Sequence, residues 1–232
     1  MREYMRTTVL LDTDGVLLDE TGYENIVCEI IVKILNETLG NDTPTHYWND
    51  VKESIGKFCP STPRFVLWKR INPDIDKYKN VLNLFNLTFS KQKPTLKLYD
   101  GIADELHKLR KHFKLLIAGQ YGKSLGELLS NNNLINLFEN SLTQDDFNIT
   151  KPDPRYFEQI AYRAKINPEN CIMVGDRIDK DVIPARQNNM GTVFLRTGIY
   201  RNQKPRIPEE FPDLILESVV GMASQIESYW NS

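Results

Sequence analysis

The sequence predicts an α/β fold in which a parallel sheet carries helices on both faces and a helical segment is inserted after the first strand. From "KPTLKLYDG" onward, short apolar runs alternate with segments of helical spacing, which is the pattern of repeated βαβ units. Between about residues 21 and 93 the spacing is helical throughout. The 232 residues are enough for one large domain, or for a core with a smaller insert.

The first strand is expected at "TVLL", and its end carries two aspartates, Asp12 and Asp14, between two apolar runs. Asp-Gly between such runs is a strong signal for a β-hairpin. The other interpretation is chemical, because Asp12 and Asp14 point to the same side of the strand end if residues 8–14 are extended. The stretch "VLLDTDGVLL" taken alone leaves both interpretations open.

The inserted segment is expected to hold four helices. The first begins with Thr21 as its cap, carries apolar residues at 26, 30 and 34, and stops at Gly40. The other three are expected at about residues 48–58, 63–71 and 74–90.

The remaining elements follow in alternation. "DGIADELHKLRKH" predicts a helix, "FKLLIAG" a strand, "GKSLGELLSNNN" and "DPRYFEQIAYRAK" helices, and "CIMVGD" a strand. A helix near residues 180–188, the strands "TVFLRTG" and "DLILE", and a last helix ending near Tyr229 complete the chain.

Polar residues stand at the expected ends of several strands. In open α/β sheets ligands bind outside the carboxyl ends of the strands, so such residues meet even when they are far apart in sequence. They are Asp12 and Asp14 after "TVLL", the stretch "AGQYGK" after "KLLI", Lys151 in "ITKPDP" before a helix, and Asp176, Asp179 and Asp181 in "GDRIDKD". Carboxylates from two strand ends suit Mg²⁺, and a nearby lysine would neutralise phosphoryl oxygens.

The order "LLDTDGVL", a strand ending near Gly119, "KPDP" and "VGDRIDKD" resembles the haloacid dehalogenase superfamily in its phosphatase branch. The helical insert resembles the α-helical cap of phosphoglycolate phosphatases and β-phosphoglucomutases. The resemblance implies a Rossmann-like core of residues 1–18 and 97–232 and a cap of residues 19–96. It also implies a Mg²⁺-dependent phosphatase that acts on a small phosphorylated metabolite through an aspartyl-phosphate.

The resemblance assigns the catalytic roles residue by residue. Asp12 would be the nucleophile that takes the phosphoryl group. Asp14 would protonate the leaving oxygen and then activate water. Lys151 would steady the nucleophile and the phosphoryl charge.

The same resemblance gives a set of metal ligands. The carboxylates of Asp12 and Asp176 and the backbone carbonyl of Asp14 would hold Mg²⁺. Asp181, in preference to Asp179, would hydrogen-bond to the metal-bound waters and to Lys151 and so orient them.

One position departs from the family pattern. The family usually has Ser or Thr at the end of the second strand, where this chain has Gly119, followed by Gln120. Glycine keeps the backbone N–H for the phosphoryl group but loses the hydroxyl, a loss of roughly 1.5–3 kcal/mol; Gln120 or Ser124 is a candidate replacement donor. Gly119→Ser or Gly119→Thr should therefore raise turnover, unless glycine is needed for a positive φ, in which case turnover should fall.

Composition excludes several classes of protein. The formal charge of −2 and the lack of a basic stripe argue against nucleic acid as a partner, and the most apolar helical stretch is broken by charges, which argues against a membrane span. The three cysteines show no paired spacing and suit a reducing cytoplasm. A monomer or homodimer is expected. Two alternative functions stay open: a phosphomutase of the same family, or a catalytically weak binding or regulatory protein with this fold.

Overall fold

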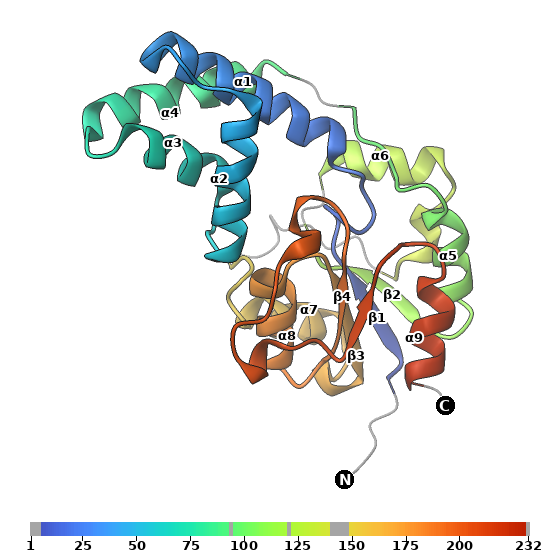
Figure 1. Ribbon diagram of the computed structural model, residues 1–232. Helices are drawn as coiled ribbons and strands as arrows, with labels where there is room; N and C mark the ends of the chain where they lie inside the picture. The colour runs from blue at the N-terminus through green and yellow to red at the C-terminus, as the bar shows by residue number, and fades with distance from the viewer. Residues whose placement is uncertain (1–5, 93–94, 120–121, 140–148, 231–232) are drawn as a thin grey trace. The chain divides into compact units, whose positions relative to one another are not determined.

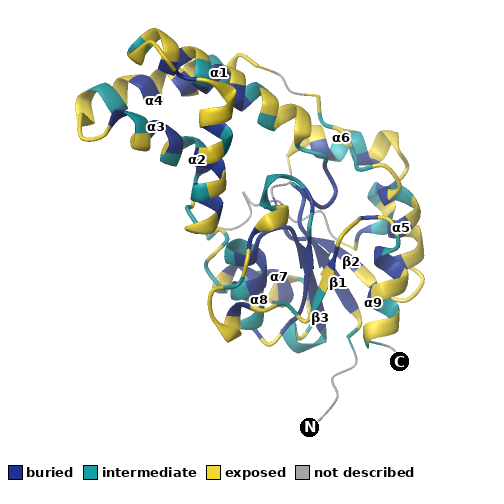
Figure 2. Cartoon of the chain, in the orientation of Figure 1, coloured by how far each residue is buried: buried dark blue, intermediate teal, exposed yellow. Residues whose placement is uncertain are grey.

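The computed structural model describes residues 6–92, 95–119, 122–139 and 149–230. The chain divides into two compact units (Figure 1). One unit comprises Met1–Asp19 and Leu96–Ser232, and the other comprises Glu20–Thr95. Each unit has its own buried interior (Figure 2).

The first unit is built on a five-stranded sheet. Its strands are β1 (Thr8–Leu11), β2 (Lys114–Ile117), β3 (Cys171–Gly175), β4 (Gly191–Leu195) and β5 (Leu214–Leu216). They lie in the order β2-β1-β3-β4-β5, and every neighbouring pair is parallel. Because β1 pairs with β2 and β3 rather than with the residues after the Asp-Gly turn, the hairpin interpretation is wrong, and the predicted parallel α/β fold is confirmed.

Helices cover both faces of the sheet, because residues that alternate along a strand point to opposite sides. Val9 and Leu11 pack on the side of α5 (Ile102–Leu109), α6 (Lys123–Asn131) and α9 (Met222–Trp230). Leu10 packs on the other side with α7 (Arg155–Ala164) and α8 (Ile183–Arg186). All strands except the edge strand β5 and the first residue of β2 are fully buried.

A buried glutamate joins two of these helices. Glu105 of α5 is 1 % exposed, and its carboxylate accepts a hydrogen bond of 2.8 Å from the Ala223 N–H in the first turn of α9. Lys108 Nζ donates to the other carboxylate oxygen at 2.8 Å. The negative charge at the start of α9 also suits the helix dipole.

The second unit contains four helices, α1 (Thr21–Leu39), α2 (Pro44–Gly56), α3 (Thr62–Ile71) and α4 (Ile75–Ser90), and its described residues contain no strand. Gly40 ends α1 in the left-handed conformation, with φ +91°. The predicted cap at Thr21 is wrong: Glu20 occupies the N-cap position, its side chain makes no capping hydrogen bond, and Thr21 is the first helical residue. α2 begins earlier than predicted because Pro44 starts it and the Thr43 hydroxyl accepts from the His46 N–H.

Candidate active site

The ends of β1 and β3 and the loop before α7 bring an aspartate, a lysine and a second aspartate together. Lys151 Nζ lies 2.7 Å from Asp12 Oδ2 and 2.6 Å from Asp181 Oδ1. β1 and β3 are neighbours in register, with Leu11 beside Val174, so the residues after these strands meet at one edge of the sheet. Asp12 and Lys151 are separated by 139 positions in the sequence, and Lys151 and Asp181 by 30, yet the three side chains form one ion-paired cluster.

Lys151 is a permanent cation in this cluster. Burial alone would lower the pKa of its ammonium, but the carboxylates of Asp12 and Asp181 raise that pKa above the ordinary lysine range. One positive charge therefore stands between two negative ones, where little water can screen it.

Three buried aspartates lie close enough to share a cation. Oxygen atoms of Asp12, Asp176 and Asp181 all lie within 4.8 Å of one another, and Asp176 is 2 % exposed. Buried like charges repel unless a cation offsets them, and Lys151 supplies a single positive charge. An all-oxygen donor set of this kind fits Mg²⁺.

Asp14 lies in the turn after β1 and is partly buried. Burial, together with the charge of Asp12, raises the pKa of its carboxyl to about 6. The turn needs glycine at position 15, where φ is +73° and a Cβ would lie 2.3 Å from Asp176 Oδ2. Asp14 is therefore held beside the cluster in an environment that favours its protonated form more than water does.

Asp181 is presented by an irregular turn rather than by a regular helix. The predicted helix over residues 180–188 is instead a π-helical turn at Ile178–Val182 followed by α8. The turn lets the Asp181 side chain fold back, where its Oδ2 accepts from the Arg177 N–H at 3.1 Å. Gly175 makes room for it, since a Cβ there would lie 2.3 Å from Asp181 Cγ. Burial and the charge of Asp12 raise the pKa of Asp181 to about 7.

Asp179 pairs with Arg177 and Gln203 and stabilises the π-helical turn at Ile178–Val182. Its carboxylate accepts hydrogen bonds from Arg177 Nη2 at 2.6 Å and from Gln203 Nε2 at 2.8 Å. The side-chain Oε1 of Gln203 accepts a hydrogen bond from the Ile178 N–H at 2.6 Å. Sequence reasoning missed Arg177 and Gln203; the arginine directly after Asp176 in "GDRIDKD" was the available signal for the first, and nothing local marks the second.

Gly119 lies directly against the residues after β1. It is not among the glycines of positive φ, so that explanation for its presence is wrong. A Cβ at residue 119 would lie 2.4 Å from Asp12 Oδ1 and 2.6 Å from the Thr13 backbone nitrogen. Close approach therefore accounts for the glycine, and it argues against the expectation that a serine or threonine here would raise turnover. Gln120 lies outside the described residues.

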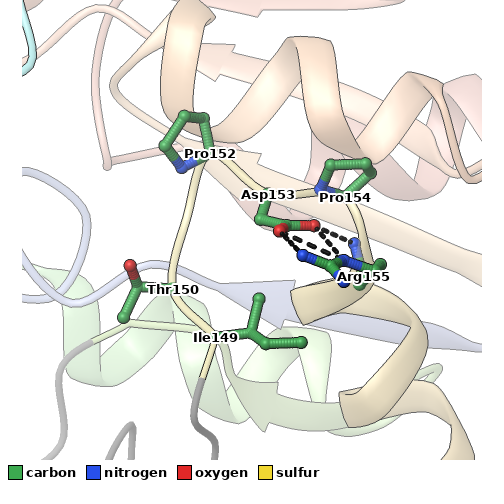
Figure 3. A pocket seen from close by; sticks show the side chains of 6 residues that line it. All are labelled: Ile149, Thr150, Pro152, Asp153, Pro154 and Arg155. Carbon is green, nitrogen blue, oxygen red and sulfur yellow. Dashed lines mark hydrogen bonds and ion pairs between the residues drawn. The ribbon is translucent and has the colours of Figure 1, made fainter.

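An open depression of about 610 Å³ lies beside the loop that carries Lys151 (Figure 3). Its lining residues are Ile149, Thr150, Pro152, Asp153, Pro154 and Arg155. Arg155 Nε is 3.0 Å from Asp153 Oδ1, so the charges at its edge pair with each other. None of the three clustered aspartates lines the depression.

In the parts of the chain that the structure describes, no helix combines the length and apolar character needed to cross a bilayer.

The site can be compared with known proteins of similar sequence. The chain is 27 % identical to a glyceraldehyde 3-phosphate phosphatase of Methanopyrus kandleri over 225 residues, which cover 92 % of this chain and 94 % of the relative. It is 24 % identical to a phosphoglycolate phosphatase of Nitrosococcus oceani, covering 91 % and 92 % of the two chains.

Solved structures share the fold. A predicted phosphoglycolate phosphatase from Haemophilus somnus superposes with a TM-score of 0.68 at 17 % identity, covering 96 % of this chain and 98 % of that one. The model of the haloacid dehalogenase-like hydrolase family matches residues 9–195, which include Asp12, Lys151 and Asp181. The chain belongs to the haloacid dehalogenase-like hydrolases.

Proposed function

We propose that this protein is a Mg²⁺-dependent phosphatase that hydrolyses a small phosphorylated metabolite through an aspartyl-phosphate. The observation that carries the proposal is the position of Lys151, whose ammonium joins Asp12 to Asp181 beside Asp176. This arrangement supports Asp12 as the nucleophile, because the ammonium of Lys151 holds its carboxylate in place at 2.7 Å.

The reaction needs two displacements at phosphorus. In the first, an Asp12 carboxylate oxygen bonds to phosphorus and the bond to the leaving alcohol breaks, while Asp14 gives its proton to the leaving oxygen. In the second, water bonds to phosphorus and gives a proton to Asp14, and the bond between Asp12 and phosphorus breaks to release phosphate. A pKa of about 6 for Asp14 supports this double role, since the carboxyl can both lose and regain a proton near neutral pH.

Mg²⁺ would be held by the carboxylates of Asp12 and Asp176 and by the Asp14 backbone carbonyl, and when bound it would offset negative charge on the phosphoryl oxygens. Asp181 would orient Lys151, which it contacts at 2.6 Å. Asp179 would not contact the substrate; it would hold Arg177, whose backbone N–H donates to Asp181.

The relatives support a substrate of modest size. Two relatives that match most of this chain are a glyceraldehyde 3-phosphate phosphatase and a phosphoglycolate phosphatase, and both of these compounds are small phosphate monoesters. We propose a substrate of the same chemical class. We also propose that the helical unit, Glu20–Thr95, acts as the cap that selects it.

The test is phosphate release from p-nitrophenyl phosphate with and without Mg²⁺, followed by a panel of small phosphate monoesters. Asp12→Asn should abolish release, because an amide cannot form the acyl phosphate. Asp104→Asn, on the exposed face of α5, makes the same chemical change away from the site and should leave release unchanged.

Each alternative predicts a different result from the same panel. Transfer of phosphate between hydroxyls of one sugar, without net release, would favour the phosphomutase. Mg²⁺ binding without turnover of any ester would favour a binding or regulatory protein. Release that persists in Asp12→Asn would reject the proposed mechanism.

A further inference from the structure

Thr13, between the two aspartates of the first motif, buries a hydroxyl that has no hydrogen-bond partner in the described part of the chain. The residue is 1 % exposed, and Oγ1 is one of the buried oxygens left unpaired. Buried hydroxyls in folded proteins are almost always hydrogen-bonded, so an unpaired one requires an explanation. A bound ligand that supplies the acceptor is one such explanation.

The position of this hydroxyl relates it to the glycine that departs from the family pattern. The point where a Cβ on residue 119 would lie is 2.5 Å from Thr13 Oγ1 and 2.4 Å from Asp12 Oδ1. The Thr13 hydroxyl therefore occupies space that a serine or threonine side chain at residue 119 would need, next to the carboxylate of Asp12. The Thr13 N–H points to the same place, since it donates to Asp12 Oδ1 at 2.7 Å.

An unpaired threonine hydroxyl is not by itself a site, as Thr8 in β1 shows. Thr8 is also fully buried with its Oγ1 unpaired, but it lies at the opposite end of the strand, beside Lys114 and Cys171. What distinguishes Thr13 is its position beside the nucleophile. A neutral donor fixed there suits an anionic oxygen brought by a substrate.

We infer that the Thr13 hydroxyl donates a hydrogen bond to the phosphoryl group, in place of the side-chain hydroxyl that Gly119 lacks. The inference rests on the proposed function, because it assigns a further binding residue to the same site. It also explains why glycine stands at residue 119: two side chains cannot share that space. Thr13 would then contact the phosphoryl group through both its N–H and its hydroxyl.

The test measures binding of inorganic phosphate in the presence of Mg²⁺ by titration calorimetry, alongside turnover of p-nitrophenyl phosphate. Thr13→Val keeps the shape of the side chain and removes the hydroxyl, Thr13→Ser keeps the hydroxyl, and Thr8→Val is the matched control. Thr13→Val should bind phosphate about tenfold more weakly or worse, the effect of one hydrogen bond to a charged group. Thr13→Ser should retain most of the affinity, and Thr8→Val should bind as the unmodified protein does.

Folding should not obscure the result, since either valine variant removes an unpaired hydroxyl rather than a hydrogen bond; thermal melts check this. Phosphate affinity of Thr13→Val equal to that of the unmodified protein would overturn the inference, and so would an equal loss in Thr8→Val. Absence of phosphate binding by the unmodified protein would overturn it as well. Failure of the proposed function is a separate outcome: no ester is hydrolysed, while phosphate binding and its dependence on Thr13 are still measured.

Discussion

Replacing Gly119 by alanine tests the packing at the centre of the site with the smallest change available. The added Cβ would lie 2.4 Å from Asp12 Oδ1, 2.5 Å from Thr13 Oγ1 and 2.6 Å from the Thr13 backbone nitrogen. Ordinary van der Waals contact begins at 3.4 Å, so each contact is about 1 Å too short. The Asp12 carboxylate can rotate, but the Thr13 nitrogen belongs to the backbone after β1 and can move only with the strand.

The expected cost follows from this geometry. Adding one carbon to a closely packed site costs roughly 1–3 kcal/mol through shifted side chains and backbone. Much of the shift falls on Asp12, which must leave the position in which Lys151 holds it at 2.7 Å. If the same free energy appears in the transition state, kcat falls roughly tenfold to a hundredfold. Gly119→Ser should behave in the same way, because its Cβ meets the same atoms.

Gly122→Ala is the matched control. Gly122 lies three positions further on, just before α6, with φ −113° and nothing within 4 Å of the position of its Cβ. The alanine there should leave turnover unchanged and should alter stability by less than about 1 kcal/mol. The assay is turnover of p-nitrophenyl phosphate well below the melting temperature of each variant, with the melt recorded by circular dichroism. Turnover of Gly119→Ala equal to or above that of the unmodified protein would refute the packing argument.

Three further predictions concern the metal, the helices and the thiols. Asp176→Asn should weaken Mg²⁺ binding more than Asp179→Asn, because Asp176 lies in the three-aspartate cluster and Asp179 does not; equal affinities by calorimetry would reject this. Burial works against ionisation of Glu105, yet its hydrogen bonds hold its folded pKa below 4.5, so its contribution to stability is complete above pH 4.5 and is lost as the pH falls through the folded pKa. The melting temperatures of Glu105→Gln and the unmodified protein should therefore converge on acidification, and a constant difference would contradict the linkage. Burial raises the pKa of the Cys171 thiol to about 12, so at about pH 8 iodoacetamide should alkylate the half-exposed Cys59 and leave Cys171 unmodified, as mass spectrometry of peptides can determine.

The sheet was predictable from sequence because its strands are continuous apolar runs. Runs such as "TVLL" and "CIMV" are buried on both faces of the sheet. The end of the first helix was predictable as well, because Gly40 adopts the left-handed conformation there. The proximity of Asp12 and Asp176 followed from the same reasoning, since residues after neighbouring parallel strands must meet. The hairpin signal at Asp-Gly was misleading because it is local, whereas the partners of β1 come from residues 114–117 and 171–175.

The details that sequence could not provide depend on contacts between distant segments. The π-helical turn at Ile178–Val182 forms where Asp181 folds back and Gln203 binds the Ile178 N–H. The sequence likewise could not show why glycine stands at residue 119. The cause is the close approach of Asp12 and Thr13, which follow a different strand. A local pattern can indicate that glycine is unusual at a position, but it cannot show which atoms exclude a side chain.

The charges of the site would link the two ligands that we propose for it, Mg²⁺ and a phosphate ester. Two carboxyl groups, those of Asp12 and Asp181, contact the ammonium of Lys151, and Asp14 and Asp176 lie beside them. The pKa values of Asp14 and Asp181 are raised because burial and the charge of Asp12 disfavour further negative charge. A phosphate ester would bring still more negative charge to this place. A divalent cation offsets both sets of charges, so each ligand lowers the electrostatic cost of binding the other. We therefore propose that the excess of carboxylates makes phosphate binding depend on the metal, while Lys151 holds the Asp12 carboxylate in place.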